Sequence, residues 1–470
     1  MSQGLRFLGF LACVYFLQKG GALTLLELAL LPVFQTNLKV SSVTYQRMKT
    51  VVFSPFSLKP LLAITSDARP ICGYQKRFYI VFTAIVGSVA LFWLALSIDR
   101  VSASAVAAMS FACVLAVSVS DILTEGKYSE IIRKDKSGTA SKLVTYVWVC
   151  IFLGRLIASI VAGPVSDHGG TDKLLFACAA LTLIICIPAC LSWMPEKKIH
   201  GWQEIPEQLV YFGIILIVST AMVVFSSVSS GLWIRCLVGT VCIASVFVSS
   251  HSLLKPDNPV AHYTNCYLFV ASVTQVDISP LEYFYTSTTC DGPQLSYTWY
   301  ITTCGVVSSI ASAVGAVAVN KFAHNWSYRT LFVLSTVFKC AGGLIDLAVV
   351  SGWVEPSRVK TVFVLGDCTA KPIVAMLAHI PAVMLTSKLV IPGKEATMYS
   401  LLAGMQNLGA LLSIVLGQVV AALLSISISE TTCDIHKLPL FVVVAQIALP
   451  LISLCFIPYV PHGTLNGKLE

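Results

Sequence analysis

Charged residues are scarce in this chain of 470 residues: Asp, Glu, Lys and Arg make up 11% of it, against about 25% in ordinary soluble proteins. Hydrophobic residues make up 56%, and the mean hydropathy is +0.81. A soluble enzyme of this composition would aggregate, since its surface would be largely apolar. The composition therefore indicates a polytopic membrane protein.

Motifs of soluble chemistry are missing as well. No Gly-rich loop ends in Gly-Lys-Ser or Gly-Lys-Thr, which argues against a pump driven by ATP. The eight histidines are dispersed, with no pair at metal-ligand spacing. The 16 cysteines follow no paired spacing, and most lie in apolar runs as small hydrophobic side chains. We therefore predict neither an enzyme nor a protein that holds a metal or another cofactor.

Long apolar runs, in contrast, recur along the whole chain. A transmembrane helix needs about 20 apolar residues to cross about 30 Å of hydrocarbon. The first run is followed by no small-residue cleavage site, so we expect a span there rather than a signal peptide. The sequence predicts 14 spans, at residues 5–35, 42–66, 77–98, 104–130, 140–165, 172–194, 208–227, 231–252, 262–286, 296–319, 328–350, 360–389, 396–427 and 436–459.

The net charge of +8 follows the expected membrane topology. Lys and Arg concentrate in alternate loops, as the positive-inside rule requires, which places both termini in the cytoplasm. The charge is therefore a topology signal, and no nucleic-acid partner is expected. Cys290 and Cys433 fall in loops expected on the oxidising side, where they could form a disulfide. The expected location is the plasma membrane.

An internal repeat organises the spans. The first six and the last six share a pattern, whereas the two between them are short and nearly free of charge. Asp121 and Glu125, four residues apart, correspond to Asp367 and Lys371 at the same spacing. We predict an all-α membrane protein of two six-helix bundles, residues 1–200 and 259–470, with a helical hairpin inserted at residues 201–258. Such repeats place a substrate site at their interface, near the middle of the membrane.

Lys59 lies inside a hydrophobic segment that also contains Pro55 and Pro60. A charge at the middle of a membrane helix costs about 2.5 to 3.5 kcal/mol, so Lys59 should face a partner, a cavity or a substrate. Each proline removes a backbone donor and bends a helix. The sequence predicts a bent, cavity-lining helix here.

Other ionisable residues also lie within spans. Asp121 and Glu125 share one helix face, where two like charges favour the uptake of a proton by one of them. A solvated ion-pair network at the membrane edge explains Glu125 equally well. Arg155, in the middle of its span, suits a carboxylate, either of a substrate or of a neighbouring helix such as that of Asp121.

A proline interrupts the ninth span within Gln275–Thr286, where acidic and aromatic residues accompany it, among them Tyr283 and Tyr285. Stacking surfaces combined with hydrogen-bonding groups suit a flat heteroaromatic ring. Anchoring at the membrane interface, where aromatic residues gather, explains these tyrosines nearly as well.

Four stretches resemble the folate-biopterin transporter family of the major facilitator superfamily, and its kinetoplastid branch in particular. They are Lys59–Arg77, Asp121–Tyr128, Pro280–Thr286 and Pro381–Gly409, the last of which contains Gly393-Lys394-Glu395-Ala396-Thr397. Within the first stretch, an acid, a glycine and two basic residues resemble the loop that latches the two halves of such transporters. This gating loop corresponds to Asp67, Gly73, Lys76 and Arg77.

The resemblance implies a major facilitator fold and a secondary transporter that meets a small-molecule substrate, protons and membrane lipid. It implies import of folate, biopterin or a related pteridine by alternating access, with Asp121 or Glu125 coupling transport to protons. A carrier of S-adenosylmethionine or of another small metabolite, and a non-transporting nutrient sensor, are the alternatives. Phe56 occupies a position where many members of the family have tryptophan, and Gln75 lies in a run that is usually more basic. The resemblance therefore does not identify the substrate.

Five intramembrane charges are predicted to form the polar core of one central site. Helices in a major facilitator arrangement face a common cavity, and unpaired each charge would cost several kcal/mol. The predicted substrate-binding residues are Lys59, Asp121, Arg155, Asp367, Lys371, Tyr283 and Tyr285. A sensor could carry apolar residues at the charged positions, so their presence favours a carrier.

Overall fold

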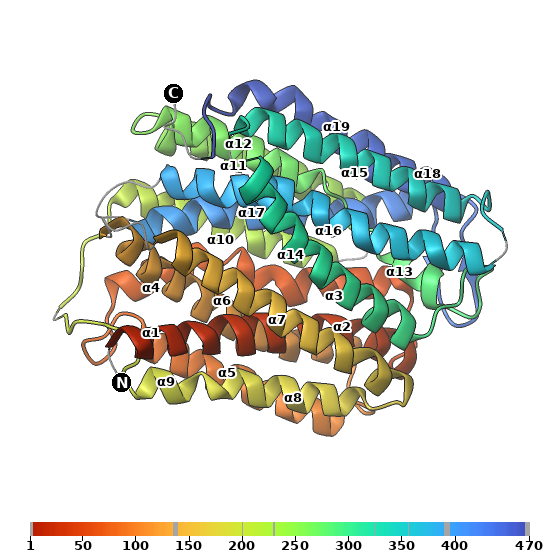
Figure 1. Cartoon of the computed structure of the whole chain (residues 1–470), viewed down its shortest axis with the longest axis horizontal. Helices are drawn as coiled ribbons and strands as arrows, with labels where there is room; N and C mark the ends of the chain where they lie inside the picture. The colour runs from red at the N-terminus through yellow and green to blue at the C-terminus, as the bar shows by residue number, and fades with distance from the viewer. Residues whose placement is uncertain are drawn as a thin grey trace.

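The computed structural model describes residues 3–134, 140–199, 201–228, 231–323, 325–355, 357–389 and 395–465. Most of this part of the chain is helical, and most helices run along the length of the molecule (Figure 1). Twelve helical segments in it are long and apolar enough to cross a membrane. The chain is therefore an all-α, multi-pass membrane protein. Gly393 and Lys394 lie outside the described residues.

The N-terminal part starts with one long span, residues 4–37, in which two π-helical segments continue the α-helices without a gap. Its elements are α1 (Gln3–Ala12), η1 (Cys13–Leu23), α2 (Thr24–Pro32), η2 (Val33–Asn37), α3 (Ser42–Phe53), η3 (Ser54–Phe56), α4 (Lys59–Ala68), α5 (Arg77–Ser97), α6 (Ala103–Lys134), α7 (Ala140–Asp167), α8 (Thr171–Ile184) and α9 (Cys186–Cys190).

A pair of helices follows, formed by α10 (Glu207–Val228) and α11 (Leu232–Ser249) with the π-helical η4 (Ser250–Leu254). The two pack against each other and against α17, and α10 also contacts α3 and α4. Many of their large apolar side chains are exposed, as expected of helices that face lipid.

The C-terminal part contains the remaining helices and one small hairpin of two paired strands. Its elements are α12 (Pro259–Val273), α13 (Ser279–Thr286), η5 (Thr298–Thr303), α14 (Cys304–Phe322), α15 (Tyr328–Val350), α16 (Ser357–Lys388), α17 (Glu395–Leu423), β1 (Ser427–Ile428), β2 (Cys433–Asp434), α18 (Leu438–Val442), η6 (Val443–Ala448), α19 (Leu449–Ile452) and η7 (Ser453–Tyr459).

Two of the 14 expected spans are broken helices, and these are the two that the twelve long segments omit. The first consists of α3, the single turn η3 at Pro55, and α4, which begins at Lys59. The second consists of α12 and α13, whose second residue is Pro280. Each pair extends from one end of the molecule toward the other (Figure 1). Proline explains the breaks, because it removes a backbone donor and clashes with the preceding turn.

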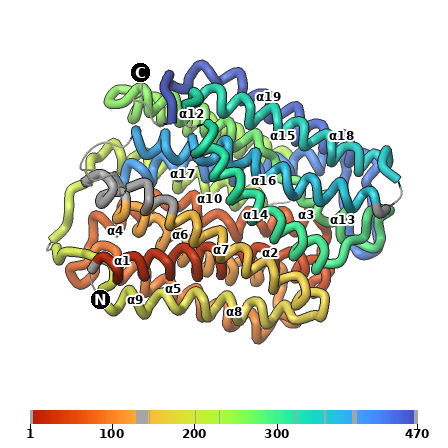
Figure 2. The backbone as a smooth tube through the Cα atoms, viewed as in Figure 1, coloured from red at the N-terminus to blue at the C-terminus, as the bar shows by residue number. Residues whose placement is uncertain are grey.

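The early and late helices lie on opposite sides of the molecule. Figure 2 shows the trace up to α9, in red to yellow, on one side, and the trace from α12 onward, in green to blue, largely on the other. Contacts between the two sides include those of α7 with α14 and η5, and those of α3, α4 and α6 with α17. The domain boundaries at residues 200 and 258 stay a prediction.

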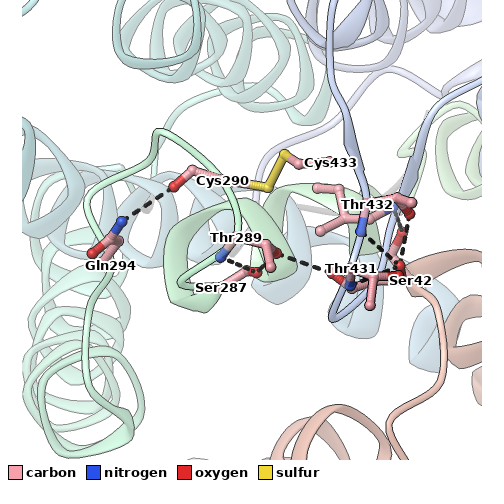
Figure 3. Close-up of a disulfide and its surroundings, with 10 residues drawn as sticks. Ser42, Ser287, Thr289, Cys290, Gln294, Thr431, Thr432 and Cys433 are labelled. Carbon is pink, nitrogen blue, oxygen red and sulfur yellow. Dashed lines mark hydrogen bonds between the residues drawn. A yellow bond between two sulfur atoms is a disulfide. The ribbon is translucent and has the colours of Figure 1, made fainter.

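A disulfide joins Cys290, in the loop after α13, to Cys433 of β2, with their Cα atoms 5.5 Å apart. The prediction of this bond is confirmed. Figure 3 shows this disulfide between the two loops. The loops are also linked by a hydrogen bond of 3.0 Å from the Thr289 hydroxyl to the carbonyl oxygen of Ser429. Ser42, at the start of α3, accepts a hydrogen bond from the N–H of Ile428 at 3.2 Å. The loops at this end of the molecule are therefore tied to one another and to α3.

Candidate functional site

A cavity of about 360 Å³ lies between the two sides of the molecule. Its walls come from α7 on the N-terminal side and from α12, α15, α16, α17, α19 and η7 on the C-terminal side. The polar and aromatic residues that line it include Trp148, Phe152, Arg155, Tyr267, Gln275, Ser335, Lys339, His379 and Gln406. Its position at the interface of the two halves is the one that the internal repeat predicts.

The cavity has a positive lining. Arg155 of α7 and Lys339 of α15 face it, and the described residues of its wall include no Asp or Glu. Neither Arg155 nor Lys339 forms an ion pair within the part of the chain that the structure describes. A low-dielectric cavity with two unpaired cations attracts an anion, and a guanidinium suits a carboxylate in particular.

Aromatic rings form one wall of the cavity. The ring centroids of Trp148 and Phe152 lie 5.7 Å apart, and the His379 ring meets Trp148 edge-on at 5.1 Å. Gln406 is held by a hydrogen bond of 3.2 Å to the Thr386 hydroxyl. The site therefore combines apolar ring surface with a few fixed polar groups, which is the usual composition of a small-molecule site.

A first cluster of charges, which we call the N-terminal cluster, consists of Lys19, Lys59, Asp121 and Glu125. Lys59 Nζ is 2.8 Å from Asp121 Oδ2 and 3.4 Å from Glu125 Oε2. Lys19 donates to both carboxylate oxygens of Asp121, each at 2.8 Å. Asp121 is completely buried and Glu125 is 9% exposed. Two lysines face two acids, so the formal charges cancel.

A second group, the C-terminal cluster, consists of Asp346, Asp367 and Lys371 with two uncharged donors. Lys371 Nζ is 2.5 Å from Asp346 Oδ2 and 2.8 Å from Asp367 Oδ2. Asp346 also accepts hydrogen bonds from the Tyr285 hydroxyl at 2.8 Å and from Gln446 Nε2 at 2.7 Å. Asp367 Oδ1 is buried without a hydrogen-bond partner among the described residues. One lysine faces two acids here, which leaves one negative charge uncompensated.

A third network connects the two broken helices. Lys49 Nζ, on α3, is 2.8 Å from Asp277 Oδ2 and 3.2 Å from Glu282 Oε1. The Tyr45 hydroxyl donates to Glu282 at 3.0 Å, and Gln46 Nε2 donates to the Asp277 carbonyl oxygen at 2.9 Å. These contacts hold α3 of the N-terminal side against α13 and the break that precedes it.

The predicted gating loop forms a compact turn at the end of the molecule opposite the disulfide. Gly73 has a φ of +82°, a conformation that favours glycine. Asp67 lies 3.5 Å from Lys76 Nζ and accepts a hydrogen bond of 3.1 Å from the Thr397 hydroxyl of α17. Glu196 accepts hydrogen bonds from the N–H groups of residues 76 and 77, at 2.6 and 3.4 Å. The loop therefore contacts both halves, and its gating role stays a prediction.

The five predicted charges fall in three places rather than one. Lys59 and Asp121 belong to the N-terminal cluster, Asp367 and Lys371 belong to the C-terminal cluster, and Arg155 lines the cavity. The physical reason is that a desolvated charge gains most from the nearest opposite charge, and these partners lie within each half. The suggested pairing of Arg155 with Asp121 is not among the described ion pairs, because two lysines occupy Asp121.

Tyr283 and Tyr285 are buried in the packing between helices. The Tyr283 hydroxyl donates to the carbonyl oxygen of Val40 at 3.2 Å, and that of Tyr285 donates to Asp346. The two side chains are 2% and 4% exposed, and neither is among the residues that line the cavity. Their role in stacking on a substrate stays a prediction.

Sequence reasoning missed several ionisable residues of these sites: Lys19, Lys49, Lys339, Asp346 and His379. Each lies within or beside an apolar run, which is the signal that identified Lys59. The pairing could not be read from the sequence, because it depends on which helix faces meet.

The arrangement of the helices in two halves, with a cavity between them, is that of the major facilitator fold. In solved structures the chain is similar to a POT family transporter in complex with a thioalcohol-conjugated peptide, at 12% identity with 96% of each chain covered and a TM-score of 0.71. It is also similar to the nucleoside transporter NupG, at 13% identity with a TM-score of 0.63, covering 97% of this chain and 100% of that one. At these identities the likeness shows the fold.

The chain belongs to the BT1 family, whose sequence model matches residues 19–469. Two relatives are a folate-biopterin transporter of Synechocystis sp., 22% identical over 97% of this chain and 82% of that protein, and a probable folate-biopterin transporter of Arabidopsis thaliana, 24% identical over 90% of each. Folate transporter 1 of Plasmodium falciparum is 20% identical over 96% of this chain and 79% of that protein. The protein is thus a membrane transporter and not an enzyme.

Proposed function

We propose that the protein imports folate or a related carboxylate-bearing pteridine across the plasma membrane, driven by a proton gradient and by alternating access of the two halves. The observation that carries the proposal is the cavity, in which Arg155 and Lys339 have no acidic counterpart among the described residues of the wall. A carboxylate supplies the missing negative charge, and the names of the curated relatives point to folates and pteridines.

The rest of the lining supports the same substrate class. A pteridine is a flat, nitrogen-rich ring, which suits the surface formed by Trp148 and Phe152 and the amide groups of Gln275 and Gln406. S-adenosylmethionine carries a sulfonium cation, for which a cavity with two cations and no facing acid is unfavourable. A sensor would bind the same pteridine without moving it, so accumulation separates the two.

The test is uptake into proteoliposomes that contain the full-length protein. Labelled folate should enter in a saturable manner, unlabelled pteridine carboxylates should compete, and S-adenosylmethionine should not. Replacement of Arg155 or Lys339 by Gln should raise the half-saturating folate concentration about tenfold to hundredfold, since each removes a charge-assisted contact of about 1.5 to 3 kcal/mol.

The matched control is Lys39→Gln, because Lys39 pairs with Glu430 on the surface and keeps 62% of its side chain exposed. It should leave the half-saturating concentration unchanged. Faster uptake of S-adenosylmethionine than of folate would contradict the proposal. So would folate binding without accumulation.

A further inference from the structure

The C-terminal cluster is unbalanced in charge, in contrast to the N-terminal one. Asp346 is satisfied by three donors, namely Lys371, Tyr285 and Gln446. Oδ2 of Asp367 forms an ion pair with Lys371, whereas its other oxygen, Oδ1, is buried with no partner among the described residues. The residue is 9% exposed. The negative charge that the lysine does not compensate therefore resides on Asp367, where its burial is costly.

We propose that Asp367 is the residue that binds and releases the transported proton. This inference deepens the proposed function and rests on it, and it moves the coupling site from Asp121 and Glu125 to the C-terminal half. A proton taken from the side of higher proton concentration binds a carboxylate oxygen of Asp367, leaves the cluster neutral, and departs to the other side after the halves have rearranged. Lys371 keeps its own proton throughout and stays paired with Asp346.

The surroundings of Asp367 favour a proton over a metal cation. The ammonium group of Lys371, 2.8 Å from Oδ2, would repel a metal ion bound to the same carboxylate. A proton needs one oxygen with a free lone pair, and Oδ1 provides it. The charged or titratable side chains that face Asp367, within the described ranges, are Asp346 of α15, Lys371 of its own helix, Tyr285 of α13, and Cys368 with its neighbour Cys304 of α14.

The cluster is placed to influence the cavity. Lys371 is one helical turn from Ala375, which lines the cavity, and two turns from His379 on the same helix. On α15, Lys339 lines the cavity and Asp346 lies seven residues further along. Lys371 keeps 37% of its side chain accessible, so the cluster is not sealed inside the protein. Protonation removes the negative charge of Asp367 and so weakens its attraction to Lys371. Because Lys371 also pairs with Asp346 of α15, the contact between α15, which carries Lys339, and α16, which carries His379, changes with it.

Asp121 is a poor candidate for the same role by the same reasoning. Both of its oxygens are occupied by lysines at 2.8 Å, and a proton there would leave two ammonium groups facing Glu125 alone. The N-terminal cluster is thus balanced without a bound proton. Asp121→Asn is therefore the matched control for Asp367→Asn, and the two are compared as folded protein, because Asp121→Asn also unpairs Lys19 and Lys59.

The first experiment reads the proton directly and needs no substrate. Infrared difference spectra of the full-length protein in liposomes, between mildly acidic and mildly alkaline buffer, should show the carbonyl band of a protonated carboxyl group, where ordinary carboxyl groups are already ionised. Asp367→Asn should abolish this band and Asp121→Asn should keep it. Should Asp367→Asn fail to fold, Asp367→Glu gives the same readout, because the band should move to the position of a glutamic acid.

The second experiment separates coupling from transport. Asp367→Asn should retain exchange of labelled for unlabelled folate, and this exchange should no longer depend on pH. Folate accumulation driven by a pH gradient should fall at least tenfold in this variant. A band that survives Asp367→Asn, or that disappears in Asp121→Asn instead, overturns the inference. Absence of folate transport by the unaltered protein contradicts the proposed function and leaves the infrared result standing.

Discussion

Lys19, Lys59 and Asp121 show at the residue scale how charge is tolerated in this membrane protein. Each lysine lies 2.8 Å from the same carboxylate, which gains two charge-assisted hydrogen bonds in a dry environment. Removing one member of a buried ion pair destabilises a protein more than replacing the whole pair by apolar residues, since it leaves a desolvated charge without a partner. The cost of a substitution here should therefore depend on how many charges it leaves unpaired.

Asp121→Asn is expected to lower the free energy of unfolding by about 3 to 5 kcal/mol, because it leaves Lys19 and Lys59 with Glu125 as their one acidic neighbour among the described residues. Glu125→Gln should cost less, since its ion pair with Lys59 is longer, at 3.4 Å. The measurement is thermal unfolding in detergent. Adding Lys59→Met to Asp121→Asn should recover part of the loss, and a double variant less stable than Asp121→Asn would contradict this account.

The sequence was sufficient to identify Lys59, Asp121, Arg155, Asp367 and Lys371 as intramembrane charges, because each interrupts an apolar run. It did not reveal their partners. Asp346 and Lys339 lie on one helix, seven residues apart, yet one pairs with Lys371 and the other faces the cavity. That difference depends on the rotation and neighbours of α15, which a linear pattern does not contain.

At the scale of elements, glycines set how closely some helices approach. The Cβ that alanine would add at Gly154 of α7 meets the backbone of η1, with Gly20 Cα only 2.8 Å away and the Phe16 carbonyl oxygen closer still. Backbone atoms cannot move aside as a side chain can. The contact between α7 and η1, which positions Lys19 next to α6, therefore requires glycine at this point.

Gly154→Ala is expected to destabilise the protein by about 1 to 3 kcal/mol or to prevent its folding, because the added methyl group overpacks the contact. Gly239→Ala on α11 is the control, since a Cβ there meets nothing within 4 Å. It should be neutral or stabilising by up to about 1 kcal/mol, as alanine is the better helix former. Thermal unfolding of both variants decides the matter, and equal stability of the two would contradict the close approach.

The junction of the two broken helices depends on Lys49 in a comparable way. Lys49→Met leaves Asp277 and Glu282 facing each other without a cation and should cost about 2 kcal/mol, a value reduced by the partial exposure of both acids. Lys39→Met, at an exposed ion pair, should stay within about 0.5 kcal/mol of the parent protein. Denaturation in detergent compares them, and a larger effect of Lys39→Met would refute the importance of the α3–α13 contact.

At the scale of the whole molecule, the sequence predicted the fold well because the bilayer limits the alternatives. The requirement for about 20 apolar residues per crossing locates the spans, and proline marks where two of them break. All 14 expected ranges correspond to helices of the structure. The relative placement of the spans was harder to predict from the sequence. Lipid is as apolar as the protein interior, so the hydrophobic pattern does not show which helix faces pack against other helices.

The orientation in the membrane is testable through the cysteines. Figure 1 marks both ends of the chain at the same end of the molecule, and the loops of Cys290 and Cys433 lie at the opposite end. With both termini in the cytoplasm, as the loop charges predict, the disulfide is outside and the exposed Cys72 of the gating loop is inside.

On intact cells, a membrane-impermeant maleimide should label Cys290 and Cys433 only after an impermeant reductant, and Cys72 only after permeabilisation. Cys290→Ser should make Cys433 reactive without reduction, and labelling of Cys72 on intact cells would show that the orientation is the reverse.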